Sequence, residues 1–144
     1  MNLPTLARDL YPWLRARLWL SLPFTPSGGV TSPFSANGNA YVAPIGKDVT
    51  PRRLECGVFP SATNNGSNYW TITLTLQATG GGGTTAQGSV STSALTAGRW
   101  DNSLALSSFT TAAWNATSFA VVYLSLTKTG TPGALYLNPI LWVS

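Results

Sequence analysis

The sequence predicts an all-β protein: an antiparallel β-sandwich preceded by a short N-terminal helical segment. Three observations support this fold class. Apolar and polar residues alternate repeatedly after residue 51, turns rich in Gly and Pro separate the alternating stretches, and no convincing helical pattern follows residue 51. Roughly five to eight short strands joined by such turns are typical of β-sandwiches. Within that class we expect a jelly roll, although the strand order cannot be derived from the sequence.

Residues 1–20 carry the helical pattern. Asn2 can cap a helix, and Pro4 suits its first turn. Pro12 removes a backbone donor, so we expect a kink there or two short helices. The apolar residues that recur at spacings of three and four are Leu3, Leu6, Leu10, Trp13, Leu14 and Leu18. Arg15 and Arg17 followed by an apolar run also invite comparison with a signal peptide, but the run is short and no clean cleavage site follows.

Residues 21–51 have the composition of a linker, because Pro and Gly recur throughout this stretch. The segment "NAYVAPI" is a candidate edge strand, since Pro44 cannot donate to a β-ladder. We therefore expect three parts: a helical anchor or assembly segment at 1–20, a linker at 21–51, and the β-sandwich domain at 52–144.

Two stretches give the clearest strands of that domain. In "NYWTITLTLQ" the residues Trp70, Ile72 and Leu74 fall on one face while threonines fall on the other, which predicts a half-buried strand. "TSFAVVYLSLTKT" is apolar on both faces, as expected of a central strand. "AQGSVSTSAL" and "RWDNSLALSSF" are weaker candidates. "TGTPG" predicts a turn before the closing strand "ALYLNPILWV", in which Pro139 indicates a bulge or an edge.

The composition argues against catalysis. The chain has no histidine, and its only acids are Asp9, Asp48, Glu55 and Asp101. Glycoside hydrolysis needs two carboxylates, for which Glu55 and Asp101 are the one plausible pair. Pairing of each acid with the neighbouring Arg53 or Arg99 is the simpler interpretation. We therefore expect no enzyme and no cofactor.

Other classes of function are also disfavoured. The net charge of +4 arises from scattered cations without a basic stripe, so we expect no nucleic-acid partner. No apolar run reaches the ~20 residues that span a bilayer. The single cysteine, Cys56, excludes an intrachain disulfide and is expected to act as a small buried hydrophobe.

Tryptophans are the remaining candidates for recognition. Trp70 is in phase with the apolar face of its strand and is assigned to the core. Trp100 and Trp114 lie near loop ends beside Asp101, Asn102 and Asn115, where they could form an exposed surface that stacks on sugar rings.

Two segments carry a resemblance to a known class. "LARDLYPWLRARL" resembles the N-terminal segments of short fibre-like virion proteins of tailed bacteriophages, and "LSLTKTGTPGALYLNPILWV" is similar to the closing hairpin of phage β-sandwich tips. The resemblance implies a structural protein of the virion: a short fibre or knob that forms a homo-oligomer, expected to be a trimer, with host-surface glycan as a candidate ligand.

In this hypothesis the N-terminal segment binds other subunits or other virion proteins. The residues assigned to that assembly anchor are Leu6, Leu10, Trp13, Leu14, Arg15, Arg17 and Leu18. Packing of this segment on its own sandwich is the alternative. Two other functions stay open: a capsid cement or decoration protein, and a carbohydrate-binding β-sandwich module of cellular origin.

Overall fold

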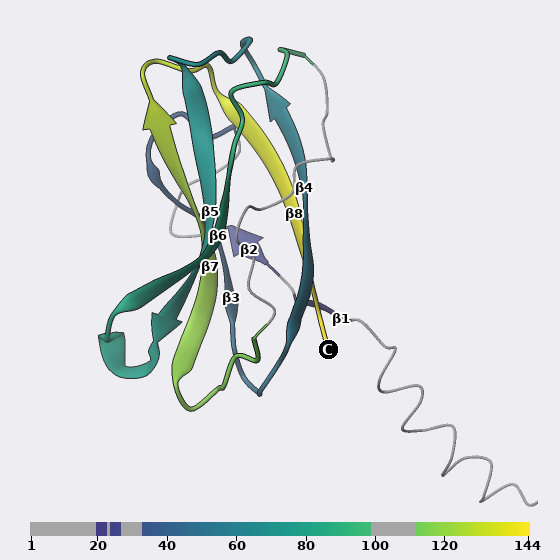
Figure 1. The fold of residues 1–144 in the computed structure, drawn as a ribbon, viewed down its shortest axis with the longest axis vertical. Helices are drawn as coiled ribbons and strands as arrows, with labels where there is room; N and C mark the ends of the chain where they lie inside the picture. The colour runs from purple at the N-terminus through teal and green to yellow at the C-terminus, as the bar shows by residue number, and fades with distance from the viewer. Residues whose placement is uncertain (1–19, 23, 27–32, 99–111) are drawn as a thin grey trace, which may run out of the picture.

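The computed structural model of the chain describes residues 20–22, 24–26, 33–98 and 112–144 (Figure 1). These residues form strands with a single 3-10 turn, η1 (Thr79–Gly81), between β5 and β6. The strands are β1 (Leu20–Leu22), β2 (Thr25–Pro26), β3 (Gly38–Pro44), β4 (Pro51–Pro60), β5 (Tyr69–Ala78), β6 (Thr84–Ser91), β7 (Phe119–Thr129) and β8 (Leu135–Val143). The helical segment expected at residues 1–20 lies almost wholly outside the described residues, whose first three, Leu20–Leu22, are strand β1.

Two antiparallel sheets pack face to face, which confirms the predicted β-sandwich. One sheet has the order β1-β8-β4 and the other the order β2-β3-β7-β5-β6. Among the described strands, the chain passes between the sheets four times, from β1 to β2, from β3 to β4, from β4 to β5 and from β7 to β8, and the two layers are seen edge-on in Figure 1. The pairs β1·β8, β3·β7 and β5·β6 nest inside one another along the chain as they do in a jelly roll.

The two strongest sequence patterns form neighbouring strands of the larger sheet. β5 alternates as predicted, with Trp70, Ile72 and Leu74 completely buried. β7 is the middle strand of the five, between β3 and β5. Its place in the sheet explains its apolar character: Val122 and Leu124 enter the core, while Val121 and Tyr123 on its other face are half-buried by their neighbours.

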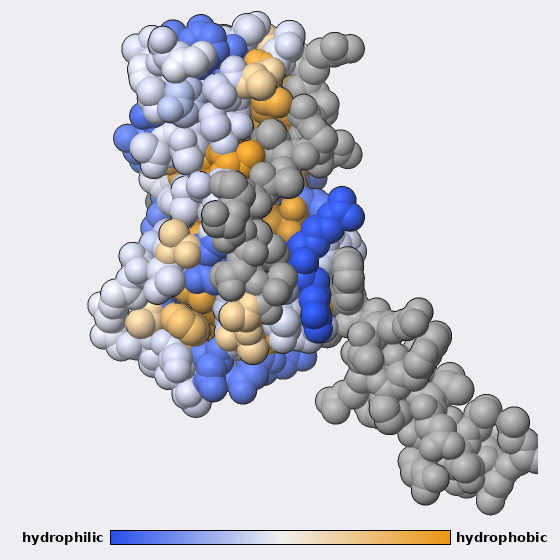
Figure 2. Space-filling view, in the orientation of Figure 1, coloured by the Kyte–Doolittle hydropathy of each residue, from blue (hydrophilic) through white to orange (hydrophobic). Residues whose placement is uncertain are grey.

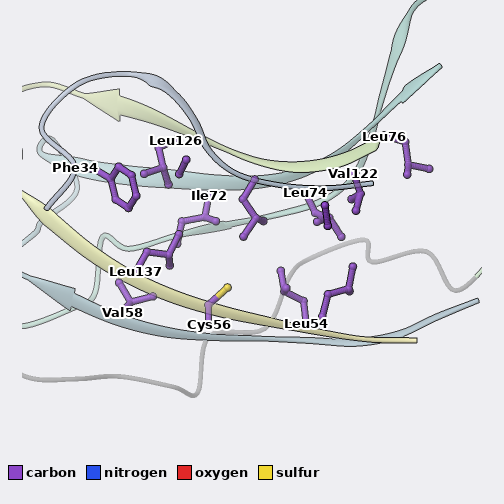
Figure 3. Close-up of a cluster of buried hydrophobic side chains, with 14 of the residues drawn as sticks. Phe34, Leu54, Cys56, Val58, Ile72, Leu74, Leu76, Val122, Leu126 and Leu137 are labelled. Carbon is purple, nitrogen blue, oxygen red and sulfur yellow. The ribbon is translucent and has the colours of Figure 1, made fainter. Parts of the chain in front are cut away.

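The core lies between the layers and takes side chains from both sheets (Figure 3). Leu54, Cys56, Val58 and Leu137 enter it from the smaller sheet and face residues of the larger sheet such as Ile72. A hydrogen bond also joins the layers, because the Tyr41 hydroxyl donates to the Leu137 carbonyl at 2.7 Å. The buried Trp70 indole donates to the Gly133 carbonyl at 2.8 Å. These bonds satisfy polar groups that would otherwise be costly inside an apolar core.

The sandwich begins earlier than the boundary predicted at residue 52. β3 lies between β2 and β7, so "NAYVAPI" does form a strand, but not at the edge of its sheet. Pro44 ends β3, where its missing donor interrupts nothing further along the strand. The core residues contributed by this part of the chain are Phe34, Ala40, Ala43, Ile45 and Val49. Frequent prolines and glycines concealed a strand and its flanking loops, which the sequence analysis interpreted as linker.

The turn predicted from "TGTPG" is formed, but the closing hairpin is not: β7 pairs with β3 and β5, whereas β8 pairs with β1 and β4, so the turn carries the chain from one sheet to the other. Gly130 has a φ of 65°, and a Cβ there would collide with the Ser67 carbonyl oxygen, so the turn requires glycine. Pro139 pairs with Cys56 without a shift of register, which excludes a bulge. Within the described residues, β1 ends opposite Leu141, so β8 is locally an edge strand at Pro139. That local edge accommodates the missing N–H.

Candidate functional site

The outer face of the three-stranded sheet is the candidate site. Along β4 and β8 every second residue is buried, so the residues between them point away from the core. In register they form four cross-strand pairs: Arg53 with Trp142, Glu55 with Ile140, Gly57 with Asn138, and Phe59 with Tyr136. We call these eight residues the aromatic face, because three of them carry aromatic rings.

One end of the aromatic face is an aromatic pair. The rings of Phe59 and Tyr136 lie 5.6 Å apart between centroids at an interplanar angle of 84°, the edge-to-face geometry that aromatic rings prefer. The relative solvent exposure of Tyr136 is 36%. Phe59 therefore supports one side of the Tyr136 ring, while part of that ring stays accessible to a partner.

The other end combines apolar and charged groups. Ile140 is 37% exposed, and Trp142 beyond it is partly buried. Arg53 Nη2 lies 3.2 Å from Glu55 Oε1, so the two charges directly opposite Trp142 and Ile140 neutralise each other. This ion pair is largely exposed and contributes little to stability. It leaves a nearly neutral rim beside the apolar side chains.

Gly57 makes a gap in the middle of the face. It pairs with Asn138 in an unbroken register, so it marks no bulge. A glycine inside a regular strand weakens the strand, and one of its uses is to allow another molecule to approach the backbone closely. The gap lies between the aromatic pair and the Glu55–Ile140 pair.

The larger sheet presents a different outer surface. Hydroxyl side chains dominate this surface, for example in the pairs Thr71–Thr127 and Thr73–Ser125 between β5 and β7. We call it the hydroxyl face, formed by Thr71, Thr73, Ser89, Ser91, Tyr123, Ser125 and Thr127. Thr75 pairs with Tyr123 in the same row but is buried. In the edge-on view of Figure 2, hydrophobic colour is concentrated between the layers, and the surface on the side of the larger sheet is mostly pale or blue.

Trp114 was a candidate for an exposed recognition surface, and the structure places it in the core instead. It is 1% exposed, its indole donates to Gln87 Oε1 at 3.3 Å, and its backbone bridges to Val49. Position near a loop end misled the sequence argument, because the loop folds into the sandwich. Trp100, the other predicted recognition residue, lies outside the described residues.

The predicted assembly residues, from Leu6 to Leu18, also lie outside the described residues. Sequence reasoning missed Tyr136, Ile140 and Trp142. Their signal was present in "LYLNPILWV", where the residues between the buried leucines are themselves largely apolar. Strict alternation would have placed polar residues there.

The structure places two of the groups considered for chemistry, Glu55 and Cys56. Glu55 is paired with Arg53, as the simpler interpretation predicted, while Asp101 lies outside the described residues. Cys56 is 2% exposed, and burial raises the pKa of its thiol to about 12, so it stays protonated and unreactive. The part of the chain that the structure describes contains no group of three His, Cys, Asp or Glu side chains placed to hold a metal ion.

The described part of the chain also contains no helix with the length and apolar character needed to cross a bilayer. Comparison with known proteins adds no relative: no family model matches the chain, and neither a curated protein nor a solved structure is similar to it. The functional argument therefore depends on this chain's own fold and surface.

Proposed function

We propose that this protein is a non-enzymatic structural protein of a bacteriophage particle, a short fibre or knob displayed on the virion. It works as a homo-oligomer, a trimer by the resemblance of its sequence to fibre-like virion proteins, and it docks on other virion proteins through residues 1–20. Decoration of the capsid is the alternative location on the same particle.

The observation that carries the proposal is the jelly-roll order of the two sheets together with an outer face that exposes part of Tyr136 and Ile140. Jelly rolls recur in viral capsid proteins and lectins, and this step is an analogy between folds. The aromatic face gives it local support. Half-exposed aromatic and aliphatic groups on one sheet are typical of surfaces that contact another molecule.

The composition agrees with a structural role. Only 8% of the residues are charged, and the chain contains no histidine, the commonest general base. The hydroxyl face supplies a polar, weakly charged exterior of the kind that a displayed knob needs.

Mass spectrometry of separated heads and tails from purified virions tests the proposal. We expect the protein at stoichiometric amounts in one of the two fractions, which also decides between fibre and decoration. Absence from purified particles would overturn the proposal. Hydrolysis of a glycan that disappears in Glu55→Gln would overturn its non-enzymatic part.

A carbohydrate-binding module is the second candidate, because Tyr136 and Trp142 could stack on sugar rings while Asn138 supplies hydrogen bonds. A glycan array separates the two candidates. Glycan binding that is lost in Trp142→Ala, by a protein absent from virions, favours the module. Glycan binding by a virion protein would instead make host-surface glycan its receptor.

A further inference from the structure

We propose that the aromatic face receives residues 6–18 of a neighbouring copy of this chain. This inference rests on the proposed function, since it names the surface through which the copies assemble. It joins two features that are otherwise unexplained: an apolar, helix-patterned segment at residues 6–18 and a half-exposed apolar face on the smaller sheet.

The point where the segment enters the sandwich supports the proposal. β1 is the first strand of the smaller sheet, and Leu20 pairs with Val143 while Ser21 pairs with Trp142. Residues 1–19, which the structure does not describe, therefore join the sandwich beside the Trp142 end of the aromatic face. In an oligomer each copy presents its segment close to the surface that would bind its neighbour's segment.

The lengths of the two surfaces agree. Residues 6–18 would span about 20 Å as a helix at 1.5 Å per residue. From Tyr136 to Trp142 the strand advances six residues, or about 20 Å at 3.3 Å per residue. The chemistry agrees as well. The leucines and Trp13 of the segment form an apolar stripe, and the face offers Tyr136, Ile140 and Trp142 with a gap at Gly57.

The connection to β1 favours a neighbouring copy. Layers of secondary structure pack about 10 Å apart, and β8 lies a further ~4.8 Å to the side of β1. Leu18 is only two residues from Leu20, a span of at most about 7 Å. Leu18 therefore cannot rest on the face of its own chain while Leu20 remains paired with Val143. A second copy has no such constraint.

The resulting contact is head-to-tail, because a segment of one copy meets a different surface of the next. Such contacts close into a ring when the rotation between copies allows it, which a trimer satisfies. The segment also gains a reason to be ordered. A short, interrupted helix is marginal alone in water and needs a partner surface.

Disulfide trapping between two full-length variants tests the proposal. One variant carries Leu10→Cys, and the other carries Asn138→Cys at an exposed position of the aromatic face. The matched control replaces Asn138→Cys by Thr127→Cys, an exposed position on the hydroxyl face. Cys56 is buried and stays in place. A size tag on one variant identifies the mixed dimer on a non-reducing gel.

We expect the mixed dimer with Asn138→Cys to exceed the Thr127→Cys control at least severalfold. Equal yields, or none, would overturn the proposal. A chain carrying both Leu10→Cys and Asn138→Cys tests whether the segment packs on its own sandwich. If it forms only an internal disulfide at low concentration, the segment packs on its own sandwich and the proposal fails.

Light scattering of Trp142→Ala gives an independent measurement. Truncating a large aromatic contact should weaken self-association at least tenfold, and Thr127→Ala should leave it unchanged. Circular dichroism establishes that both variants keep their β-structure. Unaltered association of folded Trp142→Ala would contradict the proposal. If the protein is present in virions but gives negative results in these assays, the proposed function stands and only the proposed assembly surface is excluded.

Discussion

The strands of both outer faces alternate between buried and outward-pointing residues, but the outward-pointing residues are hydroxyl-bearing on one face and largely apolar on the other. On the hydroxyl face, the residues between buried apolar positions are Thr and Ser, as at Thr73 and Ser125. On the aromatic face, the corresponding positions hold Tyr136, Ile140 and Trp142. Solvent alone explains the first face. The second retains apolar surface that the described residues leave partly exposed.

The difference matters energetically because apolar area is worth about 25 cal/mol per Å² when it leaves water. Tyr136 and Ile140 are 36% and 37% exposed, so a partner that covered them would gain the free energy of burying their remaining apolar area. Threonine pairs across strands stabilise the sheet itself by about 0.2–1 kcal/mol each and offer a partner much less. The sandwich therefore has one face suited to solvent and one suited to contact.

The largest difference in unfolding free energy is expected between substitutions of two tryptophans, one in the core and one on the aromatic face. Trp114→Ala should lower the free energy of unfolding by about 3–5 kcal/mol, because it empties a fully buried site and removes the indole donor from Gln87 Oε1. Trp142→Ala, on the aromatic face, should cost about 1 kcal/mol or less in dilute monomer. Urea denaturation of both variants measures the difference.

Similar losses of unfolding free energy from the two substitutions would contradict the assignment of Trp142 to a contact surface. Trp142 would then stabilise the monomer as much as a core residue does, and the aromatic face would serve folding rather than contact with a partner. Measurement at low protein concentration is essential, since association would add its own stabilisation to the wild-type chain.

Alkaline pH should produce the next effect, from the buried thiol beneath the aromatic face. Burial raises the pKa of Cys56 from 9.0 to about 12. Below about pH 9 both states keep the proton, and stability is unaffected. Above it the unfolded chain loses its proton first, so the free energy of unfolding should fall by about 1.4 kcal/mol per pH unit until the folded thiol ionises.

Tyr41 acts in the same direction from the larger sheet. Burial, with a smaller contribution from the nearby Cys56, raises the pKa of its hydroxyl above 10.0. Cys56→Ala separates the two groups: it should remove the decline that begins near pH 9 and leave the later one due to Tyr41. An unchanged pH profile in this variant would show that the thiol is not the group responsible.

Periodicity predicted the parts of the fold that repeat. β5 follows from alternation, because a half-buried strand must place apolar side chains on one side. β7 and β8 follow from apolar runs, and the turn between them follows from its Gly and Pro residues. β3 was harder to recognise as an inner strand. Its neighbours Pro33, Pro44 and Pro51 signal loops locally, whereas its burial depends on pairing with β7, which is distant in sequence.

The candidate site was largely unpredictable for a related reason. Alternation in "LYLNPILWV" reveals two sets of residues but does not say which set faces the core when both are apolar. Register with β4 decides it, by placing Cys56 and Pro139 inward and Trp142 outward. The burial of Trp114 likewise depends on a bridge to Val49, 65 positions earlier in the chain.

The smallest effect is expected on the hydroxyl face, and it provides the control for the whole comparison. Thr127→Val keeps the shape and β-propensity of the side chain while removing its hydroxyl group. The residue is exposed and pairs with Thr71, so the free energy of unfolding should change by less than about 0.5 kcal/mol. Self-association measured by light scattering should not change at all. If Thr127→Val instead weakened association as much as Trp142→Ala, the hydroxyl face would also be a contact surface, because only a partner could detect the loss of one solvated hydroxyl group.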